Sequence, residues 1–275
     1  MLDVETILNN VRETTPLVHN ITNYVTVNDC ANILLAADAS PTMAMEPEEA
    51  ADAVERTDAL VCNMGAISYV ESMCLAGKRA NACGIPVVLD PVGAGGTAIR
   101  RERSAQLLQQ VRFAVIRGNA SEIRALARTG SGGSGVDVSE ADAVTSDNLE
   151  ESTAFVRALA ARLHTVIAVS GALDRLSDGA RVFVGKNGCS TMARITGSGC
   201  MLTTLIGAFC GAAPETPFEA ACAAVTAMGV AGELAEARRL RFGTGNATFR
   251  SDLIDAVFNL NENQLKEMGR YEIYI

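Results

Sequence analysis

The amino-acid sequence predicts an α/β protein of three layers, in which helices cover both faces of a central, mostly parallel sheet. Short apolar segments such as residues 85–90 alternate along the chain with longer segments of helical character. The apolar segments lack the period-two alternation of half-exposed strands, which indicates strands that are buried on both faces. The chain has 275 residues, of which 48% are apolar, so it can fill a sizeable core.

The expected elements follow one another regularly. Before the alternation starts, the pattern favours helices over 3–13 and 23–36, an extended segment over 39–45 and a helix from Pro47 to about Thr57. Residues 17–23 contain more polar side chains than a simple connecting segment needs. Strands are then expected over 59–64, 85–90, 113–117 and 165–170. The helices between them are expected over 68–83, 101–111, a segment capped by Asn119, and 147–163.

The C-terminal part departs from this alternation. An antiparallel ribbon is expected from 181–185 and 189–192, followed by helices over 200–212, 216–238 and 247–260. A domain boundary, if there were one, would fall in the glycine- and serine-rich residues 129–138. Because the strand and helix rhythm resumes beyond them, we interpret residues 1–275 as a single domain.

Composition excludes several classes of partner. The formal net charge is −9 and no lysine or arginine run is present, which argues against binding to nucleic acid or to an anionic membrane. The eight cysteines are scattered, without CxxC pairs or neighbouring histidines, as is typical of reduced thiols rather than disulfides or zinc ligands. The N-terminal residues do not form a signal peptide and no apolar run is long enough for a membrane span, so we expect a cytoplasmic protein.

The most informative stretch is residues 195–200, Ile-Thr-Gly-Ser-Gly-Cys, which leads into a small, apolar segment. Gly197, Ser198 and Gly199 before a helix can turn backbone N–H groups toward an anion. The same helix end would lower the pKa of Cys200 and favour its thiolate. These features suggest phosphoryl transfer. A tight turn followed by a small buried cysteine explains the sequence of residues 195–200 equally well.

Polar residues follow three successive strands, at the sheet edge where α/β proteins bind ligands. Asp90 suits a Mg²⁺ ion or its waters, Arg117 suits bidentate binding of phosphate oxygens, and Glu122 supplies a second carboxylate. Ser170 places a hydroxyl at the end of the next strand. Singly, each has a plainer reading as a helix cap or turn residue, and Asn119 with Glu122 matches a capping box. Their coincidence indicates a Mg²⁺–triphosphate site.

Other signals are weaker. Residues 93–98 match the G-x-G-x-x-A dinucleotide pattern, but the following strand ends in Arg117 rather than in the acidic residue that a dinucleotide site requires. His164 is interpreted as a helix-terminal charge and His19 as a structural histidine, although His19 has the alternative of a substrate contact. Met43 and Met45 alternate toward one face, either as core residues or as packing for a flat heterocycle.

Taken together, these strings resemble the ribokinase-like kinases, and within them the hydroxyethylthiazole kinase family. The resemblance covers almost the whole chain, and the matching strings are residues 16–23, 39–41, 43–44, 90–94, 117–119, 121–122 and 197–200. Other ribokinase-like kinases usually have aspartate at the position of Cys200, where the thiazole kinases have cysteine. The chain differs from the family pattern at Asp38, where glycine is common, at Ser198, where threonine is common, and after Gly171, where an acidic residue is common.

The resemblance implies a ribokinase-like fold and an activity, the phosphorylation of the hydroxyl of 4-methyl-5-(2-hydroxyethyl)thiazole by ATP and Mg²⁺ in thiamin salvage. It implies a homotrimer with the thiazole near a subunit boundary. It also implies roles for individual residues: Met45 and Gly197 contact the thiazole, Arg117 and Ser170 the ATP, and Asp90 and Glu122 the metal, while Cys200 faces the substrate hydroxyl. Two alternatives stay open: a pyrimidine or sugar kinase of the same fold, and a non-catalytic sensor.

Overall fold

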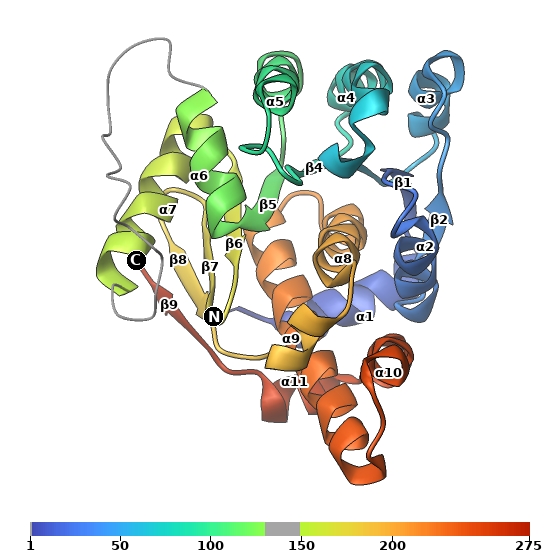
Figure 1. Ribbon diagram of the computed structural model, residues 1–275, viewed down its shortest axis with the longest axis vertical. Helices are drawn as coiled ribbons and strands as arrows, with labels where there is room; N and C mark the ends of the chain where they lie inside the picture. The colour runs from blue at the N-terminus through green and yellow to red at the C-terminus, as the bar shows by residue number, and fades with distance from the viewer. Residues whose placement is uncertain (1, 130–148) are drawn as a thin grey trace.

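One continuous sheet runs through the computed structural model (Figure 1). Within the residues that the structure describes, 2–129 and 149–275, nine strands lie in the order β2-β1-β3-β4-β5-β6-β7-β8-β9. Their bounds are β1 Leu17–Ile21, β2 Ser40–Thr42, β3 Ala59–Asn63, β4 Val87–Asp90, β5 Val115–Asn119, β6 Val166–Ser170, β7 Asp174–Ser177, β8 Val182–Gly185 and β9 Tyr271–Tyr274. The strands from β2 to β6 pair in parallel and those from β6 to β9 antiparallel. The predicted three-layer architecture with a mostly parallel sheet is confirmed.

Helices cover both faces of the sheet (Figure 1). One face packs against α3 Pro47–Val54, α4 Val70–Cys83, α5 Ala98–Gln110, α6 Ala120–Thr129 and α7 Leu149–Leu163. The opposite face packs against α1 Val4–Thr14, α2 Val27–Ala36, α8 Ser198–Ala212, α9 Pro217–Phe242, α10 Asn246–Asn259 and α11 Glu262–Met268. Alternate residues of each strand enter alternate cores: in β3, Leu60 lies in the first and Val61 in the second. This arrangement explains why the strands are apolar throughout.

Helix α8 lies directly on the parallel strands and carries the predicted cysteine loop to their carboxyl ends. All its residues from Met201 to Cys210 are buried. Gly207 allows this close approach, because a Cβ there would lie 2.5 Å from a methyl carbon of Val61. The position of the loop is therefore fixed by packing along the whole helix.

Three expectations need correction. Residues 17–21 form the inner strand β1 rather than a polar connector, since His19 and Asn20 are buried between β2 and β3. The predicted ribbon partner at 189–192 is wrong: β8 pairs with β7 and β9, and Ser190–Arg194 is a 3-10 helix. Strand β7 was not expected, because the sequence of Asp174–Ser177 is largely polar. Strand β9 and helix α11 were not expected either.

The other expected elements are present with ends that differ by a few residues, as for α2 and β5, or lie partly beyond the described part. The stretch 130–138 and the first two residues of the helix predicted over 147–163 lie outside the described residues. Asp38, at a position where the family often has glycine, has a φ of 62°, the left-handed conformation that glycine adopts freely and aspartate tolerates. This difference from the family pattern therefore preserves the backbone.

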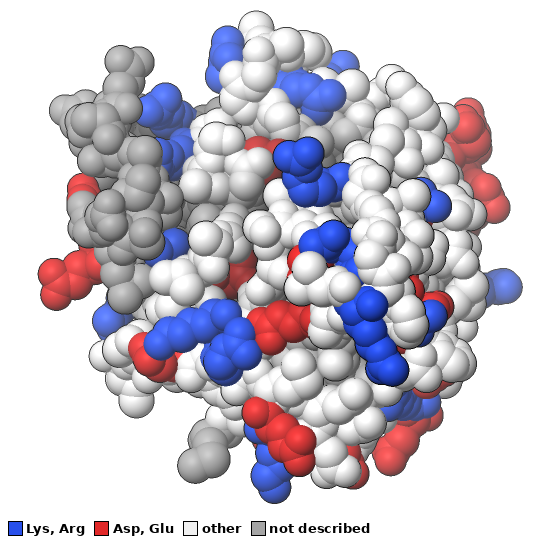
Figure 2. Space-filling model, turned by 60° about the horizontal axis from the view of Figure 1, so that its bottom comes forward, with Lys and Arg blue, Asp and Glu red and all other residues white. Residues whose placement is uncertain are grey.

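Among the described helices, α9 is the one long and apolar enough to cross a membrane, and 83% of its apolar window is buried inside the protein. On the face shown in Figure 2, basic and acidic side chains lie interspersed among uncharged ones. An anionic ligand approaching this face would therefore depend on the local groups of a binding site rather than on a broad basic surface.

Candidate active site

A cavity of about 450 Å³ opens at the carboxyl ends of the parallel strands, beside the N-terminus of α8. Its walls come from the turn between β1 and α2, the ends of β4 and β5, and the first turn of α8. The predicted site residues among its lining are Asp90, Arg117, Glu122, Gly197, Gly199 and Cys200. Residues far apart in the sequence thus meet in one place, as their positions at strand ends indicated.

The N-terminus of α8 is open toward this cavity. Gly197 is the N-cap residue, with a φ of 87°, and no side chain caps the helix. The first N–H groups of a helix have no acceptor within the helix, so those of residues 198–200 remain available to a ligand. A Cβ on Gly197 would lie 2.7 Å from Cγ2 of Thr26, so glycine is required both by conformation and by space.

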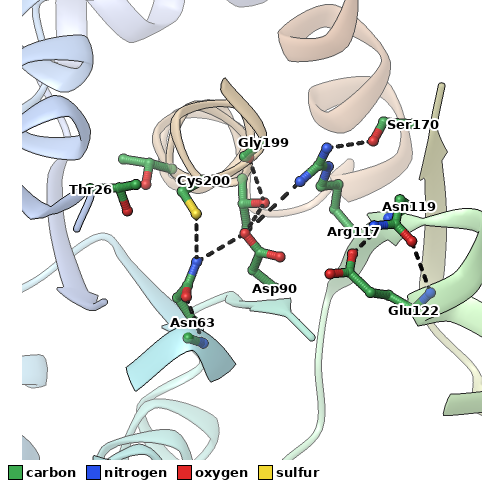
Figure 3. Close-up of polar contacts among 12 residues, drawn as sticks. Thr26, Asn63, Asp90, Arg117, Asn119, Glu122, Ser170, Gly199 and Cys200 are labelled. Atoms are coloured by element: carbon green, nitrogen blue, oxygen red, sulfur yellow. Dashed lines mark hydrogen bonds and ion pairs between the residues drawn. The ribbon is translucent and has the colours of Figure 1, made fainter. Parts of the chain in front are cut away.

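Cys200 lies in a polar environment at this helix end. Its Sγ accepts a hydrogen bond from the side-chain amide of Asn63 at 3.2 Å (Figure 3). It accepts another from the side-chain amide of Asn23 at 3.6 Å. Burial raises the pKa of the thiol, and the neighbouring Asp90 raises it further, although hydrogen bonds oppose them. This direction is opposite to the expected thiolate, because burial and the nearby Asp90 both favour the protonated thiol.

Asp90 ends β4 and is 1% exposed. Its Oδ2 accepts hydrogen bonds from Asn63 Nδ2 and Thr203 Oγ1, each at 3.0 Å, and Arg117 Nη1 lies 3.9 Å away (Figure 3). Burial raises the pKa of Asp90 to about 6, with a smaller contribution from Glu122, while Arg117 opposes the shift. The carboxylate is thus held firmly but is costly to ionise.

Arg117 lies beneath the first turn of α8 and is largely buried. Its Nη2 donates a hydrogen bond to Ser170 Oγ, and Nη1 is directed toward Asp90 (Figure 3). A Cβ on Gly199 would lie 2.5 Å from Nη1, so the guanidinium group occupies the space that this glycine leaves. The planar group is held by one hydroxyl and one carboxylate at the floor of the cavity.

Glu122 and Asn119 form the predicted capping box at the start of α6. Asn119 Oδ1 accepts from the N–H of Glu122, and Glu122 Oε2 accepts from the N–H of Asn119, both at 2.9 Å. Glu122 Oε1 accepts from the N–H of Gly93 at 3.0 Å. The carboxylate therefore ties the loop after β4 to the turn after β5, and it lines the cavity as well.

Three predicted site residues, Met45, Ser170 and Ser198, lie apart from the cavity lining in the single chain. Met45 is half-buried and lines no part of it, and neither does Ser198, whose contribution is its backbone N–H. Ser170 reaches the site through Arg117. His19 is fully buried and its Nε2 bonds to the carbonyl of Ala44 at 2.7 Å, which agrees with a structural histidine.

Sequence reasoning missed the amides Asn23 and Asn63 and the hydroxyl of Thr203. Asn63 was within an expected strand and stands at its carboxyl end, the same position that identified Asp90. The expectation that polar residues at the carboxyl ends of parallel strands line the ligand site would have identified Asn63 if it had been applied to β3. Thr203 stands one turn beyond Gly199 on α8, and its contact with Asp90 joins positions that are distant in the sequence.

The fold is that of the ribokinase-like kinases. The structure of pyridoxal kinase from Staphylococcus aureus in complex with pyridoxal matches with a TM-score of 0.59 at 14% identity, over 79% of this chain and 87% of that one. A ribokinase-like superfamily protein from Enterococcus faecalis matches with a TM-score of 0.60 at 13% identity, over 93% and 89%. At such low identity these neighbours show the fold.

Closer relatives show the family. The family model described as the hydroxyethylthiazole kinase family matches residues 8–263. Hydroxyethylthiazole kinase of Clostridium beijerinckii is 46% identical over 271 residues, 98% of this chain and 96% of its own. The structure of the hydroxyethylthiazole kinase protein from Pyrococcus horikoshii has a TM-score of 0.87 at 35% identity and covers 100% of both chains. The chain belongs to the hydroxyethylthiazole kinase family and is a kinase.

Proposed function

We propose that the protein transfers the γ-phosphoryl group of ATP, with Mg²⁺, to the hydroxyl of 4-methyl-5-(2-hydroxyethyl)thiazole in thiamin salvage. The observation that carries this proposal is the uncapped N-terminus of α8, which opens beside Arg117 and Asp90 in a chain of this family. The names of the relatives supply the thiazole alcohol as acceptor.

Each predicted residue has a role in this reaction. The backbone of Gly197, Ser198 and Gly199, with the free N–H groups of the first turn of α8, forms an anion hole for the transferring phosphoryl group. Arg117 with Ser170 binds ATP oxygens. Gly197 and Met45 contact the thiazole. Met45 lines no part of the cavity in the single chain, so its proposed contact requires the thiazole to lie near a subunit boundary. The hydroxyl oxygen forms the new bond to phosphorus as the bond from phosphorus to the β-phosphate oxygen breaks. ADP leaves, and the hydroxyl proton is released to solvent.

Cys200 orients the substrate hydroxyl rather than removing its proton in advance. Phosphoryl transfer through a loose transition state needs little deprotonation of the nucleophile, so positioning and charge neutralisation supply most of the acceleration. A thiol whose pKa is raised keeps its proton near neutral pH, and in that form it cannot accept the proton of the substrate hydroxyl. We therefore assign to Cys200 the low end of the roughly 10²- to 10⁴-fold effect of a general base.

Asp90 and Glu122 are the residues that would hold Mg²⁺. Within the described residues no group of three or more His, Cys, Asp or Glu side chains is arranged around one point. Mg²⁺ is commonly bound through one or two carboxylates together with substrate phosphates and waters, so this pair fits. Both line the cavity, and the charge of Glu122 is felt at Asp90. Bound Mg²⁺ would neutralise charge on the phosphate oxygens.

We further propose a cytoplasmic homotrimer. All eight cysteines are free, as suits a reducing compartment. Tyr24 and Val25 line the cavity yet are 89% and 56% exposed, which leaves apolar side chains at its rim for a second subunit to cover. Light scattering of the purified protein would test the trimer.

The decisive experiment is the release of ADP on mixing the protein with ATP, Mg²⁺ and the thiazole alcohol. Turnover is expected, and binding without ADP release would point to a sensor instead. A competition assay with the thiazole alcohol, a hydroxymethylpyrimidine and ribose separates the alternative kinases: preferential phosphorylation of the pyrimidine or the sugar would contradict the proposed acceptor.

A further inference from the structure

The side-chain amide of Asn63, at the end of β3, has all its hydrogen-bonding groups engaged. Its Oδ1 accepts from the N–H of Gly65 at 2.9 Å and from Nδ2 of Asn23 at 3.1 Å. Its Nδ2 donates to Cys200 Sγ at 3.2 Å and to Asp90 Oδ2 at 3.0 Å. An amide has two acceptor and two donor positions, so no capacity is left over.

These partners fix the direction of the amide. A backbone N–H can only donate, so the group facing Gly65 must be the oxygen. The Asn23 amide is fixed in the same way, because its Oδ1 accepts from the N–H groups of Val25 and Thr26. Turning Asn63 over would place two donors against each other at Gly65 and an oxygen against Asp90. The NH₂ group of Asn63 therefore faces the thiol and the carboxylate (Figure 3).

The two groups that Asn63 joins come from different elements. Cys200 is on α8, Asp90 ends β4, and Asn63 ends the neighbouring β3. One rigid NH₂ group bonded to both holds the sulfur and the carboxylate oxygen at a set separation and adds no charge between them. Asn63 is 1% exposed, so water does not compete for these bonds.

We propose that Asn63 is a positioning residue, which fixes the thiol of Cys200 relative to Asp90 and thereby the place of the substrate hydroxyl. This inference rests on the proposed function for the role of Cys200 toward the acceptor. Asn63 bonds to Cys200 and Asp90 and has no hydrogen bond to Arg117 or Ser170, so we expect its main effect on the transfer step and on the acceptor.

The first test compares Asn63→Ala with Asn20→Ala in the full chain. Asn20 is a matched control, because its equally buried amide on β1 also bonds to α8, through Thr204, without contact to Cys200 or Asp90. We expect Asn63→Ala to lower kcat by about 10- to 100-fold, with KM for ATP nearly unchanged. A loss no larger than that of Asn20→Ala would overturn the proposal. Thermal unfolding of both variants compares their folded states.

The second test is a double-mutant cycle with Cys200→Ala. If Asn63 acts through Cys200, Asn63→Ala should reduce kcat less in the Cys200→Ala protein than in the wild type, with the two fold-losses differing by more than about twofold. An equal fold-loss in both backgrounds would show a general structural role and contradict the proposal. If Asn63→Ala does not fold, Asn63→Ser replaces it in the cycle: its hydroxyl adds no charge beside Asp90, and with a single donor it cannot bond to both Cys200 and Asp90.

The wild-type assay separates this inference from the proposed function. If the wild-type protein does not phosphorylate the thiazole alcohol, the proposed function fails. If it does, and the cycle shows no coupling between Asn63 and Cys200, the proposed function stands and the inference about Asn63 fails.

Discussion

Two helix N-termini, those of α8 and α6, begin at the same edge of the sheet and line the same cavity, but they are closed in different ways. In α6 the side chains of Asn119 and Glu122 accept the first N–H groups of the helix. In α8 the N-cap is Gly197, which has no side chain to accept them. A helix end thus becomes an anion site only where its own sequence leaves the donors free.

The difference extends to the groups around each end. At α8 a guanidinium fills the space beside Gly199, so the open donors and a fixed positive charge face the cavity together. At α6 the acidic side chain of Glu122 is part of the cap and also reaches the loop of Gly93. We therefore expect changes at α8 to affect phosphoryl transfer and changes at α6 to affect metal binding and stability.

The largest effect is expected from Gly199→Val. A Cβ here would lie 2.5 Å from Arg117 Nη1, so the valine displaces the guanidinium and covers the open N–H groups. We expect kcat/KM to fall by about 10³-fold or more, since the loss of a single donor to a developing charge costs 10²- to 10³-fold. Steady-state kinetics measure it. The control is Gly245→Val, where a Cβ meets no atom within 4 Å; comparable activity in the two variants would contradict the role given to α8.

Cys200→Ala should have a smaller effect. The thiol orients the hydroxyl but does not have to ionise, so we expect a loss in kcat of about 10²-fold with turnover still measurable. The exposed Cys83 is the control, and Cys83→Ala should match the wild type. A Cys200→Ala protein at background rate would make the cysteine indispensable, and the backbone of α8 would no longer be the principal group at this end.

Glu122→Gln tests the α6 end. The two carboxylate oxygens both accept from backbone N–H groups, and glutamine can supply one oxygen at most. We expect the Mg²⁺ concentration needed for half-maximal rate to rise about tenfold, together with a loss of stability of about 1 kcal/mol. Asn119→Ala separates the two effects, because it breaks the capping box and leaves the carboxylate. An unchanged Mg²⁺ titration in Glu122→Gln would remove Glu122 from the metal site.

The sequence predicts one of these two ends better than the other. The pair Asn119 and Glu122 is a local pattern three residues apart, so the capping box was predictable from neighbouring letters. The apolar strands and the ends of β4, β5 and β6 were predictable for the same reason, since burial and strand termination are encoded locally. Strand β1 was not, because its polar His19 and Asn20 are buried only through pairing with distant strands.

The protonation state of Cys200, in contrast, depends on contacts with residues that are distant in the sequence. A local reading considers the helix dipole alone and predicts a thiolate. The structure adds burial and Asp90, which is 110 positions away in the chain, and both raise the pKa of the thiol. Electrostatics at a site assembled from several strand ends therefore requires the tertiary structure, even where residues such as Asp90 and Cys200 can be selected from the sequence.

The smallest effect is expected from a buried polar residue outside both helix ends, His19. Burial lowers the pKa of its imidazole from the usual 6.5, so the folded protein keeps it neutral while the unfolded chain takes up a proton as the pH falls below about 6.5. Its contribution to stability is therefore complete above that pH and is lost as the pH falls through the folded-state pKa.

Urea unfolding from pH 7.5 to pH 5 should show the free energy of unfolding decreasing more steeply in the wild type than in His19→Gln. The exposed His164 is the control, and His164→Asn should keep the wild-type slope. If His19→Gln also kept the wild-type dependence of the free energy of unfolding on pH, burial would not be holding the imidazole of His19 neutral.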